Sequence, residues 1–411
     1  MAFEPETVWE FTMADSVTFG TGAVSELPHA VSDLGAGTVL VVTDPGVRDA
    51  GIVDTVTTHL DGAVDYDVFD GVEPDPAMPV YDAALEAAAD TDPDVIVGLG
   101  GGSSMDVAKV ISAVHAHGGD ILDYVAEPTG AGEPIPGEGV PTVCVPTTAG
   151  TGSETSPVAV VSLPEQNLKV GISSQYILPN VALVDPLLQA TLPAGPTASS
   201  GMDALCHAIE AYTTRRYDAK ARAETPADRP DYNGRNPLTD ALARTAIELV
   251  GDNIRQAVDN GEDIEARRGM ALGSHLAAAA FTNAGLGATH AIAMSTGAHL
   301  HTPHGVTIAK VFPEVMRFNA PSAFDRYADV ADILGMETAG LSDSEAADAA
   351  ATAVERIRED VGLGGGLSDL DVTAEDVPVL TDKTMKMERL LVGNPRRVER
   401  EDIESILRAS L

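Results

Sequence analysis

The sequence predicts two regions of different fold class: an α/β region with a parallel, Rossmann-like sheet over residues 1–192, and an all-α region over residues 193–411. Three observations support this division. In the first region, short apolar runs alternate with helical stretches, as buried parallel strands do. One of these runs leads into a glycine-rich turn and then a helix. After Pro193, apolar residues recur at the three- and four-residue spacing of helices.

The first half of the chain is predicted to alternate between strands and helices. Residues 5–20 alternate loosely between apolar and polar side chains and predict a strand or hairpin. Residues 38–43 form a largely apolar run, which predicts a buried parallel strand that ends at the loop Asp44-Pro45-Gly46. The next predicted elements are a strand at residues 64–69, a helix at 80–89 and a strand at 95–99.

The strand at residues 95–99 leads into Gly100-Gly101-Gly102-Ser103-Ser104 and a predicted helix at residues 105–114. Glycines let a phosphate approach the backbone, and the start of a helix offers free N–H groups at its positive end. The run departs from the usual dinucleotide fingerprint, because Ser103 stands where the third glycine is expected. It therefore predicts either a pyrophosphate cradle or only a tight turn between strand and helix.

A second loop of small residues follows the strand predicted at residues 141–146. It runs from Thr147 to Glu154 and includes two glycines. Hydroxyl side chains beside glycine suit contacts with phosphate, ribose or a nicotinamide amide, although an ordinary flexible loop has the same composition. Residues 169–172 and 181–185 predict two further strands of the parallel α/β region.

Long helices are predicted for the second half. Apolar residues recur at helical spacing between Leu238 and Val258, and residues 270–280 and 346–360 also predict helices. A polar loop spans residues 217–236.

Asp203 and His207 lie four residues apart in a sequence that favours a helix, so their side chains share one helix face. Such a pair is more often part of a helix surface than of a metal site. However, four of the ten histidines fall close together further along the chain: His290, His299, His301 and His304. One carboxylate with three imidazoles would hold a divalent metal such as iron, zinc, manganese or cobalt. Spacing alone leaves open which of the four histidines bind.

The chain is strongly acidic, with 63 Asp and Glu residues against 25 Lys and Arg residues and a net charge of −38. The acidic residues are spread over the whole chain and would repel phosphate groups, which excludes nucleic acid as a partner. A hydrophobic content of 44% argues against a disordered acidic chain. We expect a folded protein whose acidic surface repels itself until molar salt screens it, as in an extreme halophile.

The cysteines and the apolar runs bear on the redox state of the protein and on its location in the cell. The two cysteines, Cys144 and Cys206, lie in apolar stretches and predict small core residues in place of a disulfide scaffold. The sequence has no apolar run of the length that a bilayer requires, and residues 1–10 have no secretion signal. We therefore expect a cytoplasmic protein that does not enter membranes.

Four motifs together resemble the iron-containing, or group III, alcohol dehydrogenase family over nearly the full length of the chain. In order, they lie at residues 100–109, 146–154, 201–210 and 303–305. The resemblance implies the dehydroquinate synthase-like fold of that family, with an N-terminal nicotinamide-dinucleotide-binding domain, a C-terminal helical metal-binding domain and the site in the cleft. It also implies a homo-oligomer, a homodimer or larger, that oxidises a small-molecule alcohol or hydroxyacid with NAD in preference to NADP. Fe²⁺ is the implied metal, with Zn²⁺ as the alternative.

The resemblance also implies roles for individual residues. Carried over position by position, the metal ligands are Asp203, His207, His290 and His304, which leaves His299 and His301 without that role. The cofactor-binding residues follow the predicted strands and their loops: Asp44, Gly101, Gly102, Ser103, Asp106, Thr147, Thr148, Thr151 and Lys169. Asp44 is expected at the adenosine ribose, where its carboxylate would accept hydroxyl hydrogen bonds and repel a 2′-phosphate.

One departure from the family pattern bears on the reaction. Many members have a second histidine four residues after the third ligand, proposed to help move the alcohol proton, and this chain has Met294 there. The chain also resembles the hydroxyacid–oxoacid transhydrogenase branch at residues 121–125, 205–214 and 229–237. That branch keeps its nicotinamide bound and passes hydride from a hydroxyacid to an oxoacid. We expect a simple dehydrogenase, with the transhydrogenase as the alternative and Arg215, Arg216, Arg229 or Arg235 as carboxylate partners that could reach the cleft.

An enzyme of a different reaction class shares this fold. A dehydroquinate synthase-type lyase also uses NAD and a metal, but its substrate phosphate would require clustered Lys and Arg residues. The chain has no such cluster near its four motifs. The sequence therefore favours an oxidoreductase over the lyase.

Overall fold

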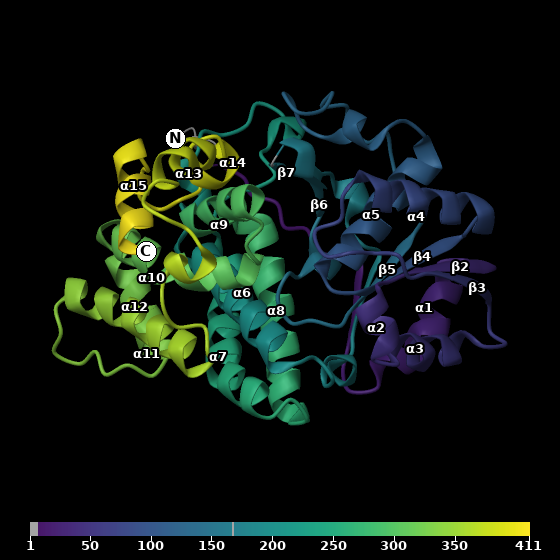
Figure 1. Ribbon diagram of the computed structural model, residues 1–411, viewed down its shortest axis with the longest axis horizontal. Helices are drawn as coiled ribbons and strands as arrows, with labels where there is room; N and C mark the ends of the chain where they lie inside the picture. The colour runs from purple at the N-terminus through teal and green to yellow at the C-terminus, as the bar shows by residue number, and fades with distance from the viewer. Residues whose placement is uncertain (1–6, 167) are drawn as a thin grey trace, which may run out of the picture. The chain divides into compact units, whose positions relative to one another are not determined.

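The computed structural model describes residues 7–166 and 168–411, and the chain folds into two compact units (Figure 1). One unit runs from Met13 to Leu192 and includes residues 261–271. The other comprises the segment up to Thr12, Pro193–Asn260 and Leu272–Leu411. The first unit is an α/β fold and the second is helical, so the predicted fold class is confirmed.

The α/β unit is built on a six-stranded sheet, all of whose neighbouring strands are parallel. Its strand order is β1-β8-β5-β4-β2-β3. The strands β2, β4, β5 and β8 are almost wholly buried, as expected for a parallel sheet that is covered on both faces. The bounds are β1 (Ser16–Phe19), β2 (Thr38–Val42), β3 (Asp65–Phe69), β4 (Val95–Gly100), β5 (Thr142–Pro146) and β8 (Val181–Val184).

Helices cover both faces of this sheet (Figure 1). Alternate residues of each strand point to opposite faces. Val39 and Val41 therefore pack with α1 (Leu27–Asp33) and α3 (Ile52–Leu60). Leu40 and Val42 pack on the other face with α4 (Met78–Thr91) and α5 (Gly102–His117). The predicted helices at 80–89 and 105–114 are confirmed as parts of α4 and α5.

Two predicted strands differ from expectation. The strand predicted at 169–172 exists as β7 (Leu168–Ser173), but it pairs antiparallel with β6 (Val158–Leu163) in a separate two-stranded sheet. Its length and composition did not show which partner it would take. The strand predicted over residues 5–20 is limited to Ser16–Phe19 among the residues described, and residues 5 and 6 lie outside them.

The helix predicted at 270–280 is confirmed within α8 (Ile264–Ala284), whose residues up to Ala271 belong to the α/β unit. The helical unit confirms the predicted helices at 238–258 and 346–360. Its core includes Ile292, Val311, Leu380 and Ile403, which come from four different helices. The bounds are α6 (Ala194–Thr213), α7 (Pro237–Asp259), α8 (Ile264–Ala284), α9 (Ala288–Leu300), α10 (His304–Asn319), α11 (Phe324–Ile333), α12 (Asp343–Asp360), α13 (Val377–Thr384), α14 (Glu388–Leu391) and α15 (Arg400–Ala409). In the α/β unit, α2 (Pro45–Asp49) follows β2.

Two smaller expectations can be compared with the described residues. Cys144 and Cys206 are both buried free thiols, as predicted. Over residues 7–166 and 168–411, none of the helices combines the length and the hydropathy that a bilayer crossing requires.

Candidate active site

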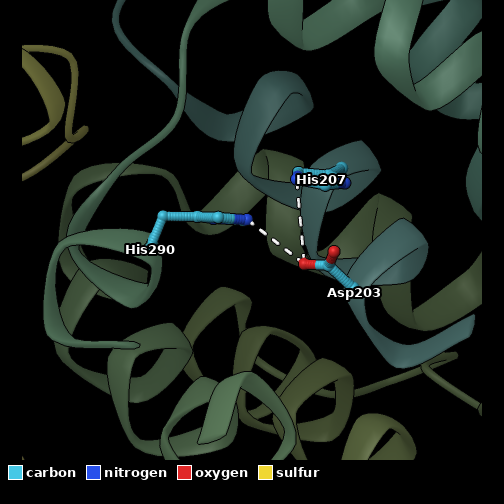
Figure 2. A group of neighbouring side chains, drawn as sticks. All are labelled: Asp203, His207 and His290. Carbon is cyan, nitrogen blue, oxygen red and sulfur yellow. Dashed lines mark ion pairs between the residues drawn. The ribbon is translucent and has the colours of Figure 1, made fainter. Parts of the chain in front are cut away.

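Three helices of the helical unit bring the four predicted metal ligands together. Asp203 and His207 lie one turn apart on the buried face of α6, His290 lies in the first turn of α9, and His304 is the first residue of α10. Oδ1 of Asp203 lies 3.7 Å from Nε2 of His207, 3.4 Å from Nε2 of His290 and 3.7 Å from Nε2 of His304. Figure 2 shows His207 and His290 directed toward this carboxylate. One oxygen and three ring nitrogens therefore face a common point.

The first turn of α10 depends on its glycine, Gly305. A side chain at Gly305 would meet the carbonyl oxygen of Ser199 at 2.3 Å, so the start of α10 approaches α6 more closely than any other residue would allow. This contact holds His304 near Asp203. His301 ends α9 in a left-handed conformation with φ of 55° and is exposed.

The cluster has the properties of a cation site. Asp203, His207 and His290 are buried, whereas the side chain of His304 is 34% exposed, so the cluster opens on the side of His304. Among the residues described, Oδ1 of Asp203 and Nε2 of His290 are buried without a hydrogen-bond partner. Buried polar atoms without partners are costly, and a bound cation would satisfy both. One carboxylate with three imidazoles fits Fe²⁺ or Zn²⁺.

Glu210 completes the cluster, and the sequence analysis did not identify it. Its carboxylate lies 2.6 Å from Nδ1 of His290 and accepts hydrogen bonds from the backbone N–H groups of Gly287, at 2.8 Å, and Thr289, at 2.9 Å. The bond to Nδ1 fixes the proton on that nitrogen and leaves the Nε2 lone pair directed at Asp203. Glu210 follows Asp203 and His207 by seven and three residues on the same helix face, which is the signal that could have identified it.

The electrostatics of the cluster favour positive charge. Burial by itself raises the pKa of Asp203, but His207, His290 and His304 outweigh it and hold that pKa well below the ordinary value. Burial lowers the pKa of His290, yet its anionic surroundings, including Glu210 and Asp203, raise it above the ordinary value. Burial raises the pKa of the Cys206 thiol to about 12, so this neighbour of His290 stays protonated.

The α/β unit places a second group of predicted residues at the carboxyl ends of its strands. Counted from β2, the strands β3-β2-β4-β5-β8 have the doubly wound order 2-1-3-4-5, whose direction reverses between β2 and β4. In such sheets ligands bind at this reversal. Asp44 follows β2, and the glycine run follows β4. The two ends are linked, because Oδ2 of Asp44 accepts a hydrogen bond from Ser104 at 3.0 Å.

The glycine run leaves the start of α5 open. Gly101 precedes this helix and, having no side chain, supplies no cap, and Ser103 lies in the first turn, partly exposed. A side chain at Gly102 would meet Cγ2 of Thr151 at 2.9 Å, so the turn packs tightly on the loop after β5. The backbone of Thr147 donates to the carbonyl of Gly100 at 2.9 Å, and Thr148 lies beside Gly101. Residues predicted to bind the cofactor therefore surround the helix start.

Two other predicted cofactor residues, Asp106 and Lys169, already bond to other residues of the protein. Oδ1 of Asp106 accepts a 2.5 Å hydrogen bond from Ser153, and Oδ2 accepts one from the backbone of Val160 at 2.9 Å. Fully buried Lys109 pairs with Asp106 at 3.1 Å and donates to the carbonyls of Ser153, Ser156 and Val158. Asp106 and Lys109 thus hold the loop after β5 in place. Lys169 pairs with Asp75 at 2.6 Å.

The doubly wound sheet with its glycine-rich helix start suits a dinucleotide, and the buried carboxylate–imidazole cluster suits a divalent metal. A dinucleotide combined with a metal is typical of an oxidoreductase. The family model for the iron-containing alcohol dehydrogenases matches residues 14–186. The model for the C-terminal part of the Fe-containing alcohol dehydrogenase family matches residues 232–411.

Individual proteins agree with the family models. The chain is 35% identical to the NAD-dependent methanol dehydrogenase of Bacillus methanolicus, over 98% of this chain and 99% of that protein. It is 32% identical to the mitochondrial hydroxyacid-oxoacid transhydrogenase of Xenopus tropicalis, over 99% of this chain and 91% of that protein. A crystal structure of 1,3-propanediol oxidoreductase superposes with a TM-score of 0.89 at 36% identity, covering 98% of this chain and 100% of the other.

The chain belongs to the iron-containing alcohol dehydrogenase family. The predictions of a nicotinamide-linked enzyme and of an iron-family metal cofactor are confirmed at this level.

Proposed function

We propose that Asp203, His207, His290 and His304 hold a divalent iron ion, and that the chain transfers hydride between a small alcohol and NAD. The observation that carries this proposal is that buried Oδ1 of Asp203 and Nε2 of His290 face each other at 3.4 Å, yet neither forms a hydrogen bond with any described residue. When bound, the metal supplies a Lewis acid for the substrate oxygen and NAD supplies the hydride acceptor. The partial exposure of His304 supports entry of the substrate from that side.

The residues around the cluster would prepare it for this chemistry. Glu210 holds the Nδ1 proton of His290, so that Nε2 keeps its lone pair for the metal. The ring of Phe281 stacks on His207 with centroids 4.4 Å apart, and His207 stacks on His290 at 4.6 Å. These contacts fix the planes of the two imidazoles and exclude water from that side of the cluster.

The α/β unit would bind NAD at the sheet reversal, in the N-terminal region predicted to hold the dinucleotide. The pyrophosphate would lie on the backbone of Gly101, Gly102 and Ser103, where the start of α5 offers N–H groups. Thr147, Thr148 and Thr151 lie in the facing loop, and Asp106 supports this loop through Ser153. Lys169, which pairs with Asp75, is proposed to contact the cofactor from β7. Asp44 would accept the hydroxyl groups of the adenosine ribose and disfavour NADP.

Met294 makes a transhydrogenase the second candidate function. This residue lies on α9 one turn after His290 and is half-buried, and its thioether cannot carry a proton. A simple dehydrogenase must release the alcohol proton at every turnover. A transhydrogenase avoids this step, because the proton given up by one substrate is taken back by the next.

One experiment separates the two candidates. Iron-loaded enzyme is first given NAD and a panel of primary alcohols, and is then given a hydroxyacid with 2-oxoglutarate and no added NAD. The proposed dehydrogenase forms NADH with an alcohol and gives no product in the second mixture. Product in the second mixture at a higher rate than the alcohol reaction would identify the transhydrogenase instead. Failure of both reactions with iron bound would contradict the proposed function.

The extreme charge supports a proposal about habitat. With a net charge of −38, the folded chain repels itself at low ionic strength, and molar salt would remove this repulsion. We propose that the protein works in a highly saline interior. The cytoplasmic location and the homo-oligomeric assembly expected from the sequence stay predictions.

A further inference from the structure

A pocket of about 270 Å³ lies at the C-terminal end of α6, within the helical unit, and four of its twelve lining residues are arginines. The lining arginines are Arg215, Arg216, Arg235 and Arg326. The whole chain has only 25 Lys and Arg residues against 63 acidic ones, so four arginines around one small pocket are a marked local reversal of charge.

The carboxylates at this pocket do not balance the arginines. Asp218 pairs with Arg216 at 2.7 Å. One oxygen of Asp240 serves both Arg235, at 3.3 Å, and Arg326, at 2.8 Å. Asp325 is the other carboxylate in the lining. Three carboxylates therefore face four guanidinium groups.

Two of the arginines keep donor capacity for a ligand. Nε of Arg235 is buried and has no hydrogen-bond partner in the described part of the chain. Burial and repulsion from Arg326 lower the pKa of Arg235, although Asp240 acts in the opposite direction. Nε of Arg215 donates at 3.0 Å to the neutral carbonyl of Asn394, and no carboxylate within residues 7–166 and 168–411 forms an ion pair with this side chain.

A helix start adds to the positive potential. The first residues of α11 line the pocket, and Ala323, which precedes this helix, supplies no side-chain cap. The N-terminal end of a helix carries a partial positive charge. The C-terminal end of α6 carries the opposite partial charge, but the four full charges of the arginines outweigh this partial charge.

We propose that this pocket binds a small oxyanion with two or more negative charges, either a phosphate or a dicarboxylate. Guanidinium groups are planar forks that bind both kinds of oxyanion through paired N–H donors. The volume suits a small metabolite better than a dinucleotide. This pocket is a different site from the metal cluster, because Thr213 in its lining lies ten residues beyond Asp203, or about 15 Å along α6.

The position of the pocket sets its ligand apart from the reacting groups. Its occupant would bear on the end of the helix that carries Asp203 and His207, without taking part in hydride transfer. The four arginines that the sequence suggested as partners of a substrate carboxylate do not all lie at this pocket. Arg215, Arg216 and Arg235 line this pocket, whereas Arg229 pairs with Glu10 at 2.8 Å.

Calorimetric titration of the iron-loaded full chain tests the proposal, with inorganic phosphate and succinate as separate probes at constant chloride concentration. Arg215→Met removes a guanidinium that forms no ion pair with the residues the structure describes, so the fold should tolerate it. Arg235→Met removes the buried donor. Arg255→Met is the matched control, because Arg255 on α7 pairs with Asp360 outside the pocket and its loss changes the net charge equally.

We expect at least one probe to bind the wild type, and its Kd to rise about tenfold or more in Arg215→Met and Arg235→Met but not in Arg255→Met. If only phosphate shows this loss of binding in the two pocket variants, the ligand is a phosphate, and if only succinate shows it, the ligand is a dicarboxylate. If both pocket variants bind the probes as the wild type does, the probes bind elsewhere and the proposal is wrong. The proposal is wrong if neither probe binds the wild type, or if Arg255→Met weakens binding as much as Arg215→Met does.

Discussion

Replacing Glu210 with glutamine should weaken metal binding although Glu210 is not itself a proposed ligand. The carboxylate accepts three hydrogen bonds, from Nδ1 of His290 and from the backbone of Gly287 and Thr289. A glutamine amide has one accepting oxygen and one donating nitrogen. In Glu210, Oε2 accepts from His290 and Gly287 and Oε1 accepts from Thr289, so the amide oxygen can keep only one of these two sets. When it keeps the bond from Thr289, the NH₂ group faces Nδ1 of His290. The imidazole proton must then move to Nε2, the atom that points at Asp203.

The size of the expected loss in metal affinity follows from this tautomer change. A proton on Nε2 removes the lone pair that would bind the metal, so the ion must displace it or lose one of four ligands. Loss of a partner that orients a metal-bound histidine costs roughly 10–100-fold in metal affinity, or about 1.4–2.8 kcal/mol. The fold should change less, because glutamine has nearly the same shape as glutamate and retains part of the backbone bonding. Glu210→Ala should be worse for folding, since each unpaired buried N–H costs about 1–3 kcal/mol.

Competition with a chelator of known iron affinity measures this effect directly. Glu248→Gln is the control, because Glu248 is exposed on α7 and its replacement changes the net charge equally. We expect Glu210→Gln to lose iron at a chelator concentration about 10–100-fold lower than wild type, with Glu248→Gln unchanged. Wild-type iron affinity in Glu210→Gln would refute the tautomer argument.

Three further predictions test other parts of the structure. Asp44→Asn should keep the cap on α2, where Oδ1 accepts from Val47 at 3.0 Å, and should narrow the preference for NAD over NADP; a wild type that already prefers NADP would show that Asp44 does not lie at the ribose. Thermal melts in increasing KCl should show a melting temperature that rises toward molar salt, because the −38 charge is screened; a flat or falling curve would contradict the halophile proposal. Hydrogen bonds from Arg317 hold the pKa of Glu355 below its usual value, so this pair stabilises the fold above about pH 4.5 and the stabilisation is lost as the pH falls. Glu355→Gln should therefore cost about 0.5–1 kcal/mol at pH 7 and less in acid, as urea unfolding at both pH values would measure.

The sequence predicted the fold wherever one element's own pattern was enough. The buried strands β2, β4 and β5 are apolar on both faces, and this pattern is visible without any partner. The hairpin of β6 and β7 was not foreseen as a separate sheet, because antiparallel or parallel pairing depends on residues far away in the chain. The short helices α1 and α3 were missed, because seven to nine residues give too little periodicity to recognise.

The sequence alone predicted only part of the candidate site. The one-turn spacing of Asp203 and His207 is a local property of α6, but the choice of His290 and His304 from four histidines came from the family resemblance. Glu210 escaped notice because its role depends on Gly287 and His290, which only the fold brings to it. The hydrogen bonds that Asp106 accepts from Ser153 and Val160 likewise form only when the loop after β5 is folded.

The most direct test of the account is the metal content of the wild type and of Asp203→Asn after loading with Fe²⁺ and gel filtration. Asparagine has nearly the shape of aspartate but lacks its charge, so the fold should persist, and circular dichroism checks this. We expect one iron per chain in the wild type and loss of most of it in Asp203→Asn. Equal iron content in a folded Asp203→Asn variant would show that the metal binds elsewhere and would contradict the account.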